Sequence, residues 1–130
     1  MLSAEDRKLI IEYRTEKAFK AFQESKDNAS MGHWTLSANR LYYAAYYMAS
    51  ALLISRELMV KSHAGVILCI GRDFVQKGLL SGEDGRLLSN LQRMRLTGDY
   101  DDLFDWTEDD IKPLFEPTEM LLKKMQSLIQ

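Results

Sequence analysis

Apolar side chains fill one long segment in the middle of the chain. The fourteen residues from 41 to 54 carry no charge, and four of them are Tyr. A surface helix normally keeps a polar face opposite its apolar stripe, and this segment has almost none. The sequence therefore predicts a helix that is covered on nearly all sides. It is either the central helix of a compact bundle or a helix with one side against a second copy of the chain.

Apolar residues elsewhere recur at helical spacing, and no segment shows sustained alternation of apolar and polar residues. Pro113 and Pro117 predict an irregular start for the last helix, which we expect to become regular only beyond about Thr118. We expect a loop over 27–34. The expected helices, each with its capping residue, cover 3–25 with Ser3, 35–57 with Thr35 or Ser37, 62–78 with Ser62, 81–98 with Ser81 and Asp84, and 107–129 with Thr107.

These patterns predict an all-α protein, an up-down four-helix bundle with an additional short or split fifth helix. The chain has 130 residues, which is enough for one domain with its own core and too few for two ordinary domains. We therefore expect a single helical domain over 1–130.

The composition is that of a globular protein, with 46% hydrophobic and 28% charged residues. A net charge of −2 argues against indiscriminate binding to nucleic acid or to an anionic membrane. The lone Cys69 cannot form an internal disulfide, and the first residues show no signal-peptide hydrophobic region. The uncharged run is shorter than the roughly 18 to 20 residues that cross a bilayer. We expect a soluble, cytoplasmic protein without membrane contact.

Arg95 is the most informative charged residue, because it continues the apolar stripe of Leu88 and Leu91 and so points towards the core edge or an interface. A charge in that place must be paired or solvated. One interpretation is an ordinary helical ion pair with Asp99, four residues on. The other is that Arg95 binds a phosphate through its planar fork while Asp99 orients it, with Tyr100 beside them.

Arg40 raises the same question at the start of the apolar segment, with Tyr43 and Tyr47 on its face of the helix. It either stacks on Tyr43 and pairs with a carboxylate, or it shares a phosphate or nucleotide pocket with Arg95. In the second case the tyrosine rings would offer stacking surfaces for bases.

Metal and cofactor chemistry has little support in the sequence. The two histidines, His33 and His63, belong to no His-x3-His spacing, and there is no Cys-x2-Cys. The acidic run over 99–110 lacks the glycine and spacing of an EF-hand loop. Phosphate-binding and dinucleotide fingerprints are also absent. We expect no metal and no cofactor.

Four segments taken in order resemble the HEPN domain, and the similarity spans roughly residues 18 to 129. They are Arg40–Leu53, Lys61–Gly65, Phe74–Gly78 and Arg95–Tyr100. The resemblance implies a five-helix bundle that forms homodimers, often encoded beside a small nucleotidyltransferase as the toxin of a toxin–antitoxin pair. Active members are metal-independent RNases whose Arg-x(4–6)-His motifs meet at the dimer interface, and other members bind nucleotides or act as scaffolds.

The chain departs from that RNase motif at its histidine. The position expected after Arg95 falls on Tyr100, Asp101 or Asp102, and the window after Arg93 holds no histidine either. A phenol with a pKa near 10 is a poor proton shuttle at neutral pH. Only His63, from another helix, could substitute. Tyr100 is also a loose candidate for modification by a nucleotidyltransferase partner.

Three hypotheses follow from these observations. The first is a homodimer without efficient RNase activity that binds a nucleotide, RNA or a nucleotidyltransferase, with no confident catalytic residue. The second is an active RNase toxin in which Arg95 acts with His63 or Tyr100. The third is a purely structural helical interaction module. The ligand-binding residues expected under the first hypothesis are Arg40, Tyr43, Tyr47, Arg95, Asp99 and Tyr100.

Overall fold

The structure is a computed structural model that describes residues 2–129, and in that range it contains helices and no strand. The prediction of an all-α bundle is therefore confirmed. The helices are α1 (Ala4–Ser30), α2 (Trp34–Ser55), α3 (His63–Ile70), the π-helical segment Gly71–Val75, α4 (Gly82–Tyr100), α5 (Glu108–Ile111), the 3₁₀ segment Lys112–Leu114 and α6 (Phe115–Ser127).

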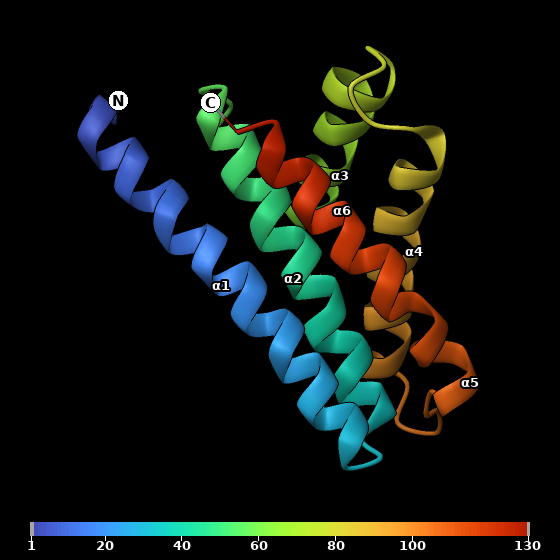
Figure 1. The fold of residues 1–130 in the computed structure, drawn as a ribbon. Coiled ribbons are helices and arrows are strands. Elements are labelled where there is room, and N and C mark those ends of the chain that lie inside the picture. The colour runs from blue at the N-terminus through green and yellow to red at the C-terminus, as the bar shows by residue number, and fades with distance from the viewer. Residues whose placement is uncertain (1, 130) are drawn as a thin grey trace.

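Helix α2 lies at the centre of the bundle (Figure 1), where it contacts α1, α4, α6 and α3. Helix α1 packs along one side of α2, and α6, α3 and α4 lie on the other side of α2 in this view. The start of α1 and the end of α6 lie at the same end of the molecule. No helix within residues 2–129 is long and apolar enough to cross a membrane.

The chain itself covers most of α2, as the compact-bundle alternative predicted. Leu41, Tyr42 and Met48 are fully buried, and Ala45 and Ala49 let neighbouring helices approach closely. Burying a large apolar side chain stabilises a fold by roughly 1.5 to 3 kcal/mol, so this helix is a main source of stability. Three rings on its remaining face stay half-buried, and we call them the tyrosine strip: Tyr43, Tyr46 and Tyr47.

Several predicted caps are present. Ser3 accepts a hydrogen bond from the Asp6 amide, and Ser62 accepts one from Gly65. Ser81 and Asp84 form the predicted reciprocal capping box, with hydrogen bonds of 3.0 and 2.8 Å. Local side-chain chemistry therefore decides where α1, α3 and α4 begin.

The predicted junction between the first two helices is wrong. Helix α1 continues to Ser30, into the segment expected to be a loop, and α2 begins at Trp34 without a side-chain cap. Thr35 and Ser37 do not cap α2, because both are used in tertiary contacts. The Thr35 hydroxyl accepts a hydrogen bond from the Trp106 amide at 3.0 Å, and Ser37 pairs with the buried Ser25 at 2.9 Å.

Gly98 does not end α4, which runs to Tyr100. A Cβ atom at Gly98 would lie 2.8 Å from the Thr35 methyl group and 3.4 Å from the Trp106 ring, so the glycine makes room for a close approach. The irregular start of the last helix is confirmed by the 3₁₀ segment between α5 and α6. Regular helix resumes at Phe115, a little earlier than predicted, because a proline in the first turn loses no intrahelical hydrogen bond.

Candidate functional site

Arg95 lies on the buried face of α4, and only 7% of the residue is exposed. Its guanidinium carbon lies 5.0 Å from the centre of the Tyr42 ring and 5.5 Å from that of Tyr43. The charge partner is Asp99, at 3.8 Å, which is longer than a hydrogen bond. The Nε atom has no hydrogen-bond partner in the part of the chain that the structure describes. Arg95 is therefore a buried cation with unused donor capacity.

Helix α2 brings a second cation to the same ring. The Arg40 guanidinium carbon lies 4.9 Å from the centre of the Tyr43 ring, and its nearest carboxylate oxygen belongs to Glu24 of α1, at 3.6 Å. Asn39 links the two cations, because its amide donates to Asp99 at 3.0 and 3.2 Å while its carbonyl oxygen accepts from Arg40 at 2.9 and 3.0 Å.

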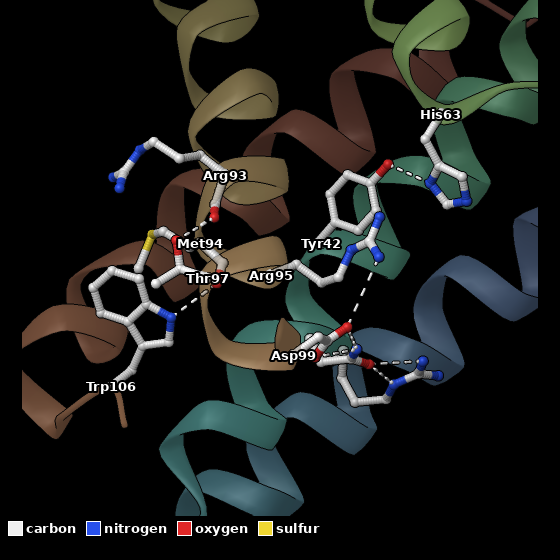
Figure 2. Close-up of polar contacts among 10 residues, drawn as sticks. Tyr42, His63, Arg93, Met94, Arg95, Thr97, Asp99 and Trp106 are labelled. Carbon is white, nitrogen blue, oxygen red and sulfur yellow. Dashed lines mark hydrogen bonds and ion pairs between the residues drawn. The ribbon is translucent and has the colours of Figure 1, made fainter. Parts of the chain in front are cut away.

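A histidine from the start of α3 completes the group. The Tyr42 hydroxyl and the His63 Nδ1 are 2.7 Å apart (Figure 2). The imidazole stacks on the Tyr46 ring, with 4.2 Å between ring centres and 13° between planes, and meets the Tyr43 ring edge-on at 5.7 Å. We call the whole group the Arg95 cluster, and its members are Asn39, Arg40, Tyr42, Tyr43, Tyr46, His63, Arg95 and Asp99.

The environment shifts the pKa values of two members. Burial raises the pKa of the Tyr42 phenol to about 12, although the charge of Arg95 opposes this shift. Burial, and then the charge of Arg95, lower the pKa of His63. At neutral pH Tyr42 is therefore a phenol and His63 is a neutral imidazole.

The structure brings together Arg40, Tyr43, Arg95 and Asp99 from the set expected to bind a ligand. Tyr47 lies at the edge, where its ring is 5.8 Å from that of Tyr43 and 4.9 Å from the Lys17 ammonium. Tyr100 is 76% exposed at the last position of α4 and makes no described contact with the cluster.

Sequence reasoning missed Tyr42 and Tyr46 as partners of Arg95 and His63. It assigned Tyr43 and Tyr47 to the Arg40 face of α2, which is correct for a single helix. Tyr42 and Tyr46 point to α3 and α4. The helical spacing within α2 cannot show which other helices pack against it. Tyr42 and His63 are also 21 positions apart in the sequence, too far for local spacing to connect them. The one available signal was the unusual density of tyrosines.

A wide groove on the surface does not coincide with the Arg95 cluster. It measures about 930 Å³, opens widely to solvent between α3 and α4, and is lined by aliphatic side chains such as Ile67, Ile70 and Leu87, with Arg86 and Arg93 at its rim. Those arginines are exposed, whereas Arg95 is buried beside the rings of Tyr42 and Tyr43. A buried and incompletely paired charge is the stronger sign of a functional site, so we place the candidate site at the cluster.

The cluster can bind an anion and stack a planar group. Two guanidinium groups on Tyr43 offer planar donors that match phosphate oxygens, and the tyrosine strip offers aromatic faces. Within residues 2–129 no three His, Cys, Asp or Glu side chains gather closely enough to hold a metal ion. The free Cys69 lies outside the cluster on α3, where its sulfur contacts Arg72 at 3.5 Å.

Comparison with known proteins gives a consistent result. Residues 11–128 match the model of the HEPN domain. A UPF0332 protein of Thermotoga maritima is 30% identical over 125 residues, which cover 96% of this chain and 95% of the relative. Two proteins of Methanocaldococcus jannaschii, each named "Putative toxin", are 24% and 31% identical. The first match covers 92% of this chain and 81% of the relative, and the second covers 70% and 67%.

Proposed function

The chain belongs to the HEPN domain family, and on that premise we propose that it is a homodimeric module that binds a phosphate-bearing ligand, a nucleotide or a segment of RNA, without efficient RNase activity. One observation carries the proposal. The guanidinium of Arg95 is buried between α2 and α4, lies over two tyrosine rings, and keeps an Nε donor without a partner.

The unpaired donor is costly in the free protein. Leaving a buried polar group without a hydrogen bond costs roughly 1 to 3 kcal/mol. Two oxygens of one phosphate next to Arg95 would accept from Nε and from one terminal nitrogen, in the planar two-bond geometry that arginine favours. Asp99 can give way, because at 3.8 Å its carboxylate makes no hydrogen bond to Arg95 and is held mainly by the Asn39 amide.

Tyr43 makes nucleotide ligands a better fit than simple anions. Both Arg40 and Arg95 approach its ring, and the adjacent rings of Tyr46 and Tyr47 are half-buried and reachable. Base stacking on an aromatic side chain contributes roughly 1 to 3 kcal/mol per base and tolerates any base. A ligand with a phosphate at the guanidinium groups and a base on the strip uses both features.

Homodimer formation is supported by the exposed side of α2. The tyrosine strip is the part of this apolar helix that the bundle leaves half-covered, and aromatic side chains are enriched at protein interfaces. The family resemblance also implies dimers in which the arginine motifs of two chains meet. A twofold contact beside the strip would bring two Arg95 clusters close together and leave the phosphate groups of a ligand between them.

An active RNase toxin is the second candidate function. The imidazole of His63 favours it, and the hydrogen bond to Tyr42 holds that imidazole in the cluster. This bond places an imidazole from α3 beside Arg95, although the positions after Arg95 hold no histidine. The two relatives with toxin in their names point the same way. A nucleotidyltransferase partner remains part of the proposal, on the family resemblance. The purely structural module loses support, because it predicted Arg40 and Arg95 on opposite sides, whereas both approach Tyr43.

Binding experiments with matched arginine variants test the proposal. We expect AMP, ADP and a fluorescein-labelled uridine hexanucleotide to bind wild type, with affinity falling at least tenfold in Arg95→Ala. Arg93→Ala removes the same charge from the same helix. Its side chain extends away from the cluster (Figure 2) and donates to Asn90 at 2.6 Å, so binding should stay near that of wild type.

Two results would count against the proposal. Equal binding by wild type and Arg95→Ala would remove the ligand site from the cluster. Degradation of cellular RNA by the purified protein in the presence of a chelator would replace the binding module with the RNase toxin. Analytical ultracentrifugation at micromolar concentration tests the homodimer separately.

A further inference from the structure

Tyr42 carries a hydroxyl group that is held entirely inside the protein. The residue is 0% exposed, and its hydroxyl lies 2.7 Å from the His63 Nδ1 and also interacts with the Arg95 side chain, which can only donate to it. Two arrangements of protons fit this distance. Either the phenol donates to a bare Nδ1, or Nδ1 carries a hydrogen and donates to the phenol oxygen.

The buried position favours donation by Tyr42. If Nδ1–H were the donor, the phenol hydrogen would have no acceptor among the described residues, and a buried donor without a partner is unfavourable. The guanidinium of Arg95, 5.0 Å from the ring centre, also attracts the oxygen lone pairs and repels the phenol hydrogen. Both effects direct that hydrogen towards His63.

An Nδ1 without hydrogen determines the protonation of the other ring nitrogen, Nε2. A neutral imidazole has one N–H, so an accepting Nδ1 leaves the hydrogen on Nε2. Nε2 has no hydrogen-bond partner among residues 2–129, and His63 is only partly buried, so this N–H can reach a ligand. Stacking on Tyr46 at 13° and edge contact with Tyr43 hold the plane of the ring in place.

We propose that Tyr42 fixes His63 in the Nε2–H tautomer, and that His63 then binds a phosphate oxygen of the ligand as a neutral donor. This inference rests on the proposed function, because it assumes that a phosphate lies at Arg95. His63 is a ligand-binding residue in this account, and Tyr42 is the residue that positions it. A nitrogen that already carries hydrogen cannot accept one from a ribose hydroxyl, so this tautomer predicts weak RNase activity at a site that contains an imidazole.

Nitrogen-15 NMR of histidine-labelled protein tests the tautomer without any ligand. The chain has two histidines, so His63→Gln assigns both signals, and the exposed His33, which makes no cap hydrogen bond, is an internal reference. At pH 7.5 we expect His63 to show an unprotonated Nδ1 and a protonated Nε2. In Tyr42→Phe the His63 signals should move towards the tautomer average shown by His33. A protonated Nδ1 in wild type, or no change in Tyr42→Phe, would overturn the inference.

Binding of the uridine hexanucleotide tests the role of His63 as a donor. The amide of His63→Gln retains an N–H donor but no acid–base group, and His63→Leu retains neither. We expect Gln to bind within about twofold of wild type and Leu to bind roughly three- to tenfold more weakly, as the loss of one hydrogen bond implies. Equal binding by the Leu variant, or RNA cleavage by wild type that His63→Gln abolishes, would refute the inference.

The two proposals fail in different experiments. If Arg95→Ala binds like wild type, the proposed function fails even where the NMR tautomer is the expected one. If Arg95→Ala weakens binding and the tautomer is wrong, only the inference about Tyr42 and His63 fails. Neither experiment measures RNase activity, so the two proposals can be told apart even if the protein cleaves no RNA.

Discussion

Replacing Arg95 by Met separates a functional arginine from a structural one. Methionine matches the length of the buried arginine stem and carries no charge. If Arg95 is kept for a ligand, the Arg95→Met variant should fold about as stably as wild type and lose binding. If Arg95 holds the bundle together, removing it should destabilise the fold severely.

The structure provides the size of each contribution. The guanidinium lies over the rings of Tyr42 and Tyr43, and a partly desolvated contact of this kind stabilises by roughly 1 to 2 kcal/mol. The Asp99 pair, at 3.8 Å, adds roughly 0 to 1 kcal/mol. Removing the unpaired Nε donor recovers roughly 1 to 3 kcal/mol. These terms nearly cancel, so we expect the free energy of unfolding to change by less than about 1.5 kcal/mol.

Urea unfolding measured by circular dichroism provides the free energy, and titration with the uridine hexanucleotide provides the affinity. We expect a midpoint close to that of wild type, an unchanged dependence on urea, and at least tenfold weaker binding. Arg93→Met is the control, because Arg93 is exposed on the same helix. A loss of more than about 3 kcal/mol in Arg95→Met alone would mean that Arg95 is structural, and our reasoning would be wrong.

Three further predictions concern the interface, a helix cap and pH. Tyr47→Glu places a charge at the edge of the tyrosine strip and should give a monomer in analytical ultracentrifugation. The fold should survive, because Lys17 lies 4.9 Å from the Tyr47 ring and can pair with the new carboxylate. A stable dimer would exclude a twofold contact beside the strip. Ser81→Ala removes the capping box and should lower the unfolding free energy by about 1 kcal/mol, measured in urea; no loss would show that the cap is dispensable. The pKa of His63 is lowered from 6.5 by burial and Arg95, so its contribution to stability is complete above about pH 6.5 and is lost as the pH falls through the lower folded-state value. The urea midpoint of wild type should therefore fall from pH 7 to 5 more steeply than that of His63→Gln, and equal slopes would contradict the shift.

Local chemistry allowed much of the fold to be predicted from the sequence. Helix starts at Ser3, Ser62 and Ser81 were correct, because a capping hydroxyl bonds to an amide only three residues away. The start of α2 was not, because Thr35 bonds to Trp106 in the segment between α4 and α5, and Ser37 bonds to Ser25 of α1. The same side chain can cap a helix or join two helices, and only packing decides between these uses.

The candidate site divides in the same way. Helical spacing within α2 placed Arg40 beside Tyr43, and spacing within α4 placed Arg95 beside Asp99. It could not show that the two pairs would meet, since 55 positions separate Arg40 from Arg95 in the printed sequence. Tyr100 was expected to bind a ligand together with Arg95, but its ring lies in solvent at the end of α4, away from the Arg95 cluster.

The sequence by itself determined the helices, the nearly uniform hydrophobicity of α2 and the absence of a histidine after Arg95. Each of these is a matter of residue type and short spacing, which the chain carries before it folds. Only the tertiary structure decided that α3 delivers His63 to Tyr42, and that α4 buries Arg95 over the same rings. Helix packing sets those contacts, and it depends on how whole surfaces fit together rather than on neighbours along the chain.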